Sequence, residues 1–204
     1  MKNLFKLVSV LLFFVGVFAF GQEEGFSLNS QSDKLYKSES FKNFVLTDYD
    51  ILFKHKADIN FVKDSQKDNT IVNEKNADES AQKLGFTSLK EMESIYKNLY
   101  LTKVKFENEF NIKDFSQEDV NIAAAAVIYD YLDTNMSETT SKSPLCWRKY
   151  KRCIAIAAGT GYGVHVGCLG VDWTGIGAVI CHGAAFGTAW LMMESCEDDY
   201  IECK

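Results

Sequence analysis

No cysteine occurs before Cys146, which excludes a lipid-attachment cysteine beside the N-terminal apolar segment. Residues 22–142 contain few glycines and many Lys, Glu, Asp, Asn and Phe, whereas all six cysteines and most of the glycines follow them. The polar stretch 133–143, DTNMSETTSKS, lies at this change of composition and is typical of a linker. We therefore expect two regions, with their boundary near residue 140.

Positive charge is also in short supply. The chain has 22 Lys and Arg against 28 Asp and Glu, which gives a formal net charge of −6. Phosphate contacts need basic faces, so we expect no nucleic-acid partner.

Catalytic motifs are missing as well. The three histidines, His55, His165 and His182, belong to no HExxH motif, and the chain has no Gly-x-Ser-x-Gly elbow and no P-loop. The tetrapeptides TGYG (160–163) and TGIG (174–177) are too short to be phosphate loops. We predict a protein that is not an enzyme, with no cofactor, no catalytic residues and no metal.

The N-terminus has the organisation of a cleaved signal peptide. The basic segment MKNLFK is followed by a 14-residue apolar run, and Ala19, Phe20 and Gly21 form a small-x-small cleavage site. The run is short for a membrane span. We expect residues 1–21 to be removed, the mature chain to begin at Gln22, and the protein to enter an oxidising compartment outside the cytoplasm, whether periplasm, cell surface or medium.

Residues 39–132 are predicted to form an acidic helical domain, whereas residues 22–38 show no sustained period and are predicted to be disordered. Three capping-box patterns mark helix starts: Asn76 with Glu79, Ser88 with Glu91, and Ser116 with Asp119. Gly85 is a helix stop. The expected packing stripes are Phe41, Phe44, Val45, Leu52 and Phe53; Leu89, Met92, Tyr96, Leu99, Phe106 and Phe110; and Val120, Ala124, Val127 and Tyr131.

The spacing of the cysteines is a mirror image, with gaps of x6, x14, x12, x14 and x6 around the turn-like sequence GVDWTG. A helix turns about 100° per residue, so these steps bring the three cysteines of each half toward one side. Ser143 and Pro144 are typical of an N-cap and a first helical position. We predict an all-α fold in which residues 144–204 form an antiparallel helical hairpin, with arms at 144–168 and from about 175 onward. Its nested disulfides are Cys146–Cys203, Cys153–Cys196 and Cys168–Cys181.

This register brings the basic segment CWRKYKRC (146–153) opposite the acidic segment CEDDYIEC (196–203). Arg152 is then across from Glu197, and Lys151 from Asp198. Exposed ion pairs contribute at most about 1 kcal/mol each, so this clasp would favour the register without holding the hairpin together.

Two alternatives to the hairpin remain open: another connectivity among the six cysteines, and a Cys2His2 metal site made of His165, Cys168, Cys181 and His182. Consecutive side chains on a helix point about 100° apart, which argues against the metal site.

Glycine recurs every four residues in both arms, a spacing that lets helix backbones approach closely. The stretches 154–171 and 173–193 contain no Asp, Glu, Lys or Arg, and Asp172 lies at the turn between them. They are compatible with a membrane-active hairpin or with a hairpin packed on the N-terminal helices. The predicted hairpin-packing residues are Gly159, Gly163, Gly167, Gly183 and Gly187.

The signal peptide, the segment AQKLGFTSLKEMESIYKNL (81–99) and the C-terminal Cys/Gly/Ala segment together resemble a group of secreted bacterial proteins of uncharacterised function. The C-terminal segment is also distantly similar to halocin-type bacteriocin domains, which carry more cysteines at other spacings. Its staples resemble in logic those of coiled-coil-helix proteins and α-hairpinins, which use Cx9C or Cx3C where this chain has Cx6C.

Two functional hypotheses follow. In the first, the chain is a bacteriocin-like precursor that releases a membrane-active hairpin, and its partner is membrane lipid. In the second, it is a secreted structural or protein-binding module whose hairpin stays packed on the N-terminal helices. The oligomeric state is left open.

Overall fold

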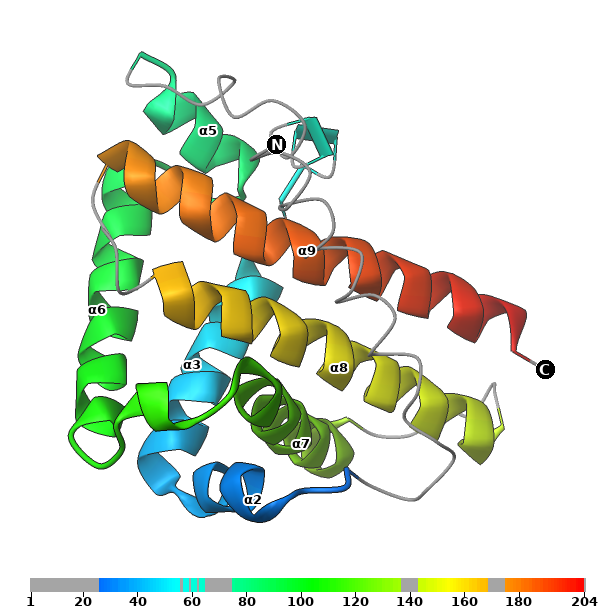
Figure 1. Cartoon of the computed structure of the whole chain (residues 1–204). Coiled ribbons are helices and arrows are strands. Elements are labelled where there is room, and N and C mark those ends of the chain that lie inside the picture. The colour runs from blue at the N-terminus through cyan, green and yellow to red at the C-terminus, as the bar shows by residue number, and fades with distance from the viewer. Residues whose placement is uncertain are drawn as a thin grey trace, which may run out of the picture.

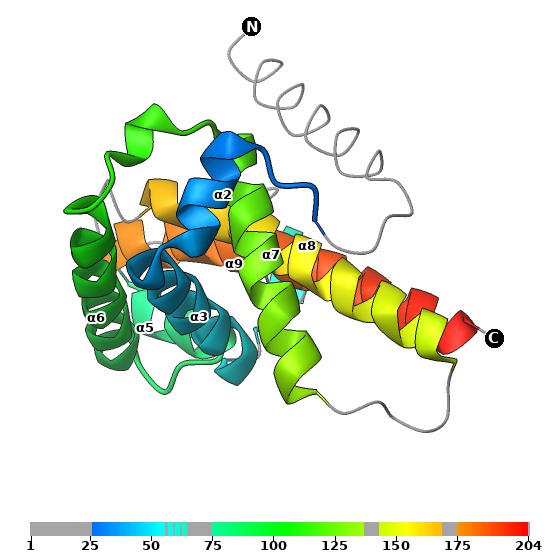
Figure 2. The same cartoon turned by 90° about the horizontal axis from the view of Figure 1, so that it is seen from below.

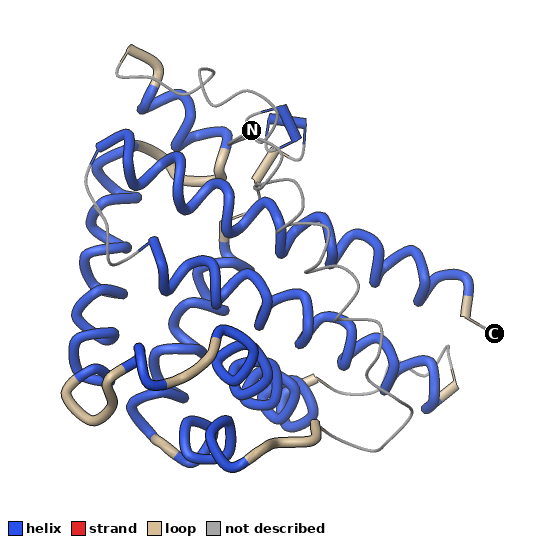
Figure 3. Tube along the Cα trace, viewed as in Figure 1, coloured by secondary structure: helices blue, strands red, loops and turns tan. Residues whose placement is uncertain are grey.

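The chain folds into packed α-helices, and no strand occurs in the residues that the structure describes (Figure 1, Figure 3). This computed structural model describes residues 26–55, 57–58, 60–61, 63–64, 75–136, 143–168 and 175–203. Within these ranges it gives the backbone alone at residues 164, 167, 168, 175–178, 180–182 and 184. The predicted signal peptide and most of the predicted linker lie outside the described residues.

The described residues form helices separated by segments of unequal length. In chain order they are α2 (Ser30–Lys37), α3 (Glu39–Lys54), α5 (Ala77–Lys83), α6 (Leu89–Glu107), the 3-10 turn η1 (Ile112–Asp114), α7 (Gln117–Asn135), α8 (Pro144–Cys168) and α9 (Gly175–Glu202).

The C-terminal hairpin has the predicted arms, with α8 and α9 side by side (Figure 1). Ser143 is the N-cap of α8, and its hydroxyl accepts a hydrogen bond from the Cys146 amide at 3.2 Å. Two of the three predicted disulfides are present: Cys146–Cys203 and Cys153–Cys196, with Cα–Cα distances of 5.9 and 5.7 Å. The predicted pair Cys168–Cys181 lies outside the described side chains.

Helix α7 runs antiparallel to α8 and crosses it, as the turned view in Figure 2 shows. Contacts extend from Gln117 beside Gly163 to Asp133 beside Lys151. The predicted capping box starts α7: the Ser116 hydroxyl accepts a hydrogen bond from the Asp119 amide, and the Asp119 carboxylate accepts one from the Ser116 amide, both at 3.1 Å. The hairpin therefore rests on an N-terminal helix along much of α8.

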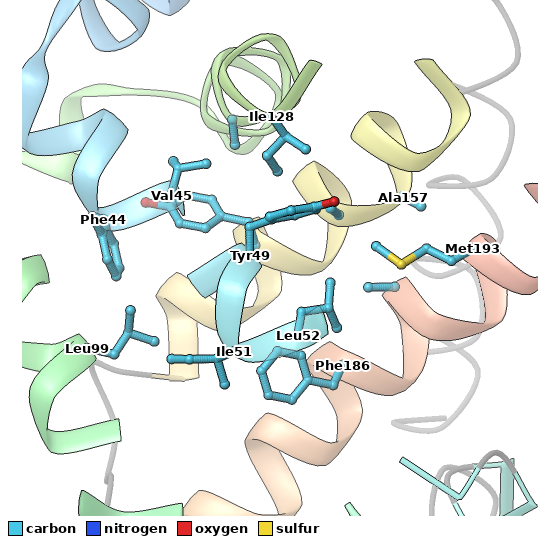
Figure 4. Close-up of a cluster of buried hydrophobic side chains, with 14 of the residues drawn as sticks. Phe44, Val45, Tyr49, Ile51, Leu52, Leu99, Ile128, Ala157, Phe186 and Met193 are labelled. Atoms are coloured by element: carbon cyan, nitrogen blue, oxygen red, sulfur yellow. The ribbon is translucent and has the colours of Figure 1, made fainter. Parts of the chain in front are cut away.

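Helix α3 supplies the centre of the core. Its Phe44 and Val45 lie between side chains of the other helices, including Leu99 of α6, Ile128 of α7 and Phe186 of α9 (Figure 4). These residues belong to one continuous buried cluster that contains both N-terminal and hairpin residues. The boundary near residue 140 therefore separates two compositions but not two separately packed cores.

The other predicted helix boundaries are met in part. Gly85 follows α5 with a positive φ of 91°, and the Phe86 amide donates to the Ala81 carbonyl, as in a glycine helix stop. Ser88 caps α6 by accepting from the Glu91 amide at 3.1 Å. Asn76 is the N-cap of α5, but its side chain makes no capping bond there, so the predicted box is wrong.

Three further expectations are corrected. The segment predicted to be disordered contains α2, because Asn29 caps it and Leu35 is fully buried. The predicted linker begins three residues too early, since α7 continues to Asn135. Phe53, predicted to pack in the core, is 45% exposed near the end of α3. Helix α2 has one buried apolar residue in its two turns, which is too few to give a helical pattern of hydrophobic residues in the sequence.

The carboxylate of Asp119 joins the start of α7 to α2, since the Asn29 side-chain amide donates to it at 2.6 Å. Hydrogen bonds from the Ser116 hydroxyl and from Asn29 lower the pKa of Asp119 below its ordinary value of 3.8.

We predict that Asp119→Ala lowers the free energy of unfolding by about 1–2 kcal/mol at neutral pH, because a buried cap is lost. A carboxyl group whose pKa is lower in the folded than in the unfolded state stabilises the fold at pH values above its unfolded pKa. This stabilisation is lost as the pH falls through the folded pKa. The difference from wild type should therefore shrink below the ordinary value of 3.8. Urea unfolding over a pH series measures it. Glu118→Ala, which alters the exposed neighbour, should cost less, and equal losses would contradict the prediction.

Candidate functional site at the helical hairpin

The glycines of α8 meet two different helices. A Cβ added at Gly159 would lie 2.8 Å from the Asn121 carbonyl oxygen and 2.9 Å from the Ala125 nitrogen, both in the backbone of α7. A Cβ at Gly163 would overlap the side chains of Gln117 and Asn121 of the same helix. Close helix approach was predicted at these positions, but its partner is α7 rather than α9.

The contact between the two arms uses a glycine that was not predicted. A Cβ at Gly161 would lie 2.7 Å from the Ala189 Cβ and 3.2 Å from the Ala185 carbonyl oxygen. The register of the cysteines places position 161 opposite position 188, next to Ala189. This register and the small residues of α9 could have identified Gly161 as the contact between the two arms.

The predicted packing glycines of α9 do not form one interface. Gly183 faces Leu84, at the end of α5, with 3.5 Å from the added Cβ to the nearest Leu84 carbon. Gly187 is buried. Gly167 on α8 lies outside the described side chains. The helices rotate so that Ala185 and Ala189, rather than Gly183, face α8.

We predict that Gly159→Ala lowers the free energy of unfolding by up to about 2 kcal/mol. Overpacking against a helix backbone costs about 1–3 kcal/mol, and the gain in helix propensity offsets about 1 kcal/mol. Gly183→Ala is the matched control, because its new methyl meets only flexible leucine carbons at contact distance. It should be neutral or stabilising in the same thermal and urea unfolding experiments. Equal effects of the two changes would contradict this assignment of faces.

The two disulfides hold the free end of the hairpin together with an aromatic cluster. The Trp147 and Tyr150 rings lie 5.6 Å apart, and the Tyr150 and Tyr200 rings 4.7 Å apart. Burial, followed by the nearby Glu197, raises the pKa of Tyr150 above its ordinary value. This stapled end, residues 144–153 and 194–203, contacts α7 at Lys151 and extends past that helix (Figure 2).

The predicted charge clasp between α8 and α9 is wrong for Lys151, which pairs with α7 instead. Its buried ammonium group pairs with Asp133 of α7 rather than with Asp198, and lies 5.8 Å from the centre of the Tyr129 ring. Lys151 is eight residues before Gly159 and so shares the face of α8 that meets α7. Arg152, expected opposite Glu197, has its guanidinium 5.5 Å from the centre of the Phe26 ring.

A buried polar pair ties the hairpin to α3. The Nδ1 atom of His165 lies 2.5 Å from Oδ1 of Asp48, and both side chains are almost fully enclosed. The Tyr96 ring of α6 stands edge-on to the imidazole at 5.2 Å. Burial, followed by the charge of Asp48, raises the pKa of Tyr96 well above its ordinary value. The pair was missed in the sequence because its members are 117 positions apart.

A small cavity of about 10 Å³ lies next to Asp48, with Tyr162 and Phe186 also in its lining. The Tyr162 hydroxyl is buried and has no hydrogen-bond partner among the described residues. This volume admits at most one water molecule, so the cavity is no binding site for an organic ligand.

The alternative Cys2His2 site stays a prediction. His165 contacts Asp48, whereas the side chains of Cys168, Cys181 and His182 lie outside those described. Across the described residues, no three His, Cys, Asp or Glu side chains are grouped as a metal site would require. In the same residues, no helix combines the length and the apolar character needed to cross a bilayer.

We predict that Asp48→Ala lowers the free energy of unfolding by about 3–5 kcal/mol, because it leaves His165 buried beside an apolar residue. Asp50→Ala is the matched control on the same helix, since it removes an exposed pair with Lys54 and should cost at most about 1 kcal/mol. Urea unfolding at neutral pH compares the two. A loss at Asp48 no larger than that at Asp50 would contradict a structural role for the buried pair.

Comparison with known proteins gives no relative: no family model, no curated protein and no solved structure matches the chain.

Proposed function

We propose that the chain is an exported, non-catalytic binding protein in which the hairpin is a permanent part of the fold and its stapled end is the binding surface. The observation that carries the proposal is the contact of Gly159 with the backbone of α7. A glycine face that receives a neighbouring helix of the same chain is already occupied, and it has no need of a second hairpin or a lipid.

The buried pair supports the same proposal. His165 of the hairpin and Asp48 of α3 would both need a new partner or water if the hairpin separated from the N-terminal helices. Separation would also expose Ala155, Phe186 and Ala189, which lie in the shared core. Each lost contact costs free energy, so a released hairpin would be poorly stabilised on its own.

Export is supported by the two disulfides, because such bonds persist in oxidising compartments. A non-catalytic role is supported by the positions of the reactive groups. The imidazole of His165 is 1% exposed and cannot reach a substrate, and the four cysteines of the stapled end are bonded to one another.

The test is the mass of the protein recovered from the envelope and medium of its own cells. We expect one uncleaved chain that begins at Gln22, and non-reducing peptide maps that contain the Cys146–Cys203 and Cys153–Cys196 bridges. The same maps report the state of Cys168 and Cys181. A main species that comprises only residues 143–204 would overturn the proposal and favour the bacteriocin-like precursor.

A further inference from the structure

The outer disulfide of the stapled end, Cys146–Cys203, joins opposite ends of two helices (Figure 1). Cys146 is the third residue of α8, whereas Cys203 directly follows the last residue of α9. The amides of a helix N-terminus carry partial positive charge, and the carbonyls of a C-terminus carry partial negative charge. A thiolate is therefore stabilised at Cys146 and disfavoured at Cys203, so the two sulfurs of this bridge are unequal.

The N-cap of α8 adds a direct contact to the sulfur of Cys146. The Ser143 hydroxyl donates to Sγ of Cys146 at 3.1 Å, and it accepts from the amide of the same residue at 3.2 Å. A hydrogen bond to an ionised acceptor is stronger than one to a neutral acceptor. This bond therefore strengthens when Cys146 leaves the bridge as a thiolate, and it favours breaking the bridge in that direction.

The inner bridge, Cys153–Cys196, has no comparable asymmetry. Each bridge has one buried cysteine, Cys146 or Cys196, and one half-buried cysteine, Cys203 or Cys153. An external thiolate reaches the half-buried member, so the buried member is the sulfur that leaves. Cys146 leaves at a helix N-terminus, whereas Cys196 leaves in the interior of α9, where no free amides stabilise a thiolate.

We propose that Sγ of Cys203 is a site of thiol–disulfide exchange with a dithiol reductant, and that the Cys146–Cys203 bridge is a redox switch for the stapled end. The bridge persists in an oxidising compartment and opens where such a dithiol is supplied. This switch rests on the proposed function, because it regulates the surface that is assigned there to binding.

The exchange takes place in two steps. In the first, a thiolate of the dithiol attacks Sγ of Cys203, the bond to Cys146 breaks, and its electron pair goes to Sγ of Cys146. In the second, the other thiolate of the reductant attacks its own sulfur in the resulting mixed disulfide and releases Cys203. The bridge gains two electrons and two protons, and the dithiol is oxidised to its own disulfide.

Opening this bridge releases the last two turns of α9. Four carboxylates are exposed in these turns: Glu197, Asp198, Asp199 and Glu202. The last turn contains no basic residue. Carboxylates at a helix C-terminus oppose the helix dipole, so the helix end is poorly stabilised without its staple. The part of α9 after Cys196 therefore frays, while the Cys153–Cys196 bridge keeps the two arms together.

Fraying uncovers aromatic side chains that the bridged form covers. The Tyr200 ring lies 5.8 Å from the Trp147 ring and 4.7 Å from the Tyr150 ring. Trp147 is 4% exposed, and its indole N–H has no hydrogen-bond partner among the described residues. When Tyr200 moves away, Trp147 gains exposure, and an exposed indole N–H bonds to water or to an acceptor on a bound protein. The open form therefore presents an aromatic face with an unused donor.

Reduction of the full mature chain with dithiothreitol under native conditions tests the exchange. An alkylating reagent traps free thiols at successive times, and peptide mass spectrometry measures the opening of each bridge. We expect Cys146–Cys203 to open about tenfold faster than Cys153–Cys196, and the two rates to become similar in denaturant, where helix termini no longer exist. Equal rates in the native chain, or earlier opening of Cys153–Cys196, overturn the proposal. A difference that persists unchanged in denaturant also overturns it.

Variants of the N-cap separate the chemical role of the hydroxyl from a structural one. Ser143→Ala removes the donor to the Cys146 sulfur and should slow the opening of the Cys146–Cys203 bridge about threefold. A purely structural role predicts the reverse, because loss of a cap loosens the helix end and exposes the bridge. Ser143→Thr keeps a hydroxyl and should open at nearly the wild-type rate. Unchanged or faster opening in Ser143→Ala overturns the proposal.

Ser88→Ala is the matched control for the cap. It removes the N-cap hydroxyl of α6, which contacts neither bridge, and should leave both opening rates unchanged. A decrease equal to that in Ser143→Ala would contradict a contact-specific effect and overturn the proposal.

Hydrogen exchange of the selectively reduced chain tests the release of α9. Amides of residues 197–203 should exchange about tenfold faster than in the bridged chain, whereas those of α7 should be unchanged. Unchanged exchange in residues 197–203 overturns the switch. None of these results depends on whether the hairpin is cleaved, which the mass measurement decides separately, so the switch and the proposed function fail independently.

Discussion

The rest of the structure depends on the close approach of α7 and α8 at Gly159. Two helix backbones can touch there because no Cβ separates them, and the Asn121 carbonyl and the Ala125 nitrogen occupy the space. That contact sets which face of α8 points toward the N-terminal helices. Ala155, Gly163 and Lys151 lie on the same face and are buried in consequence. The opposite side of α8 is then left for α9 and for solvent.

The hairpin is held by forces of different kinds along its length. At the stapled end, disulfides and stacked aromatic rings join α8 to α9. Farther along, Gly161 against Ala189, the Asp48–His165 pair and the shared apolar core join it to the body. The outer segment projects with its charges exposed, whereas the inner segment is enclosed on several sides. This division is why the proposed interaction surface lies at one end of the hairpin and not along its uncharged middle.

Much of the hairpin could be predicted because its determinants are local and periodic. The bounds of α8 follow from Ser143, Pro144 and the cysteine spacing, and the register of α9 follows from the mirror symmetry. Capping at Ser88 and Ser116 was readable for the same reason. Helix α2 was not readable, because its stability comes from Leu35 in the core and from the link of Asn29 to Asp119 rather than from its own pattern.

The sequence by itself determined that this protein is helical and that two disulfides staple its C-terminal hairpin, since helix geometry converts residue spacing directly into a shared face. Only the tertiary structure decided the partner of each face. Lys151 was expected opposite Asp198 and instead pairs with Asp133, and Asp48 meets a histidine 117 positions away. Both contacts depend on how α8 is rotated about its own axis. That rotation is set by packing against α7, and the spacing of residues within α8 does not predict it.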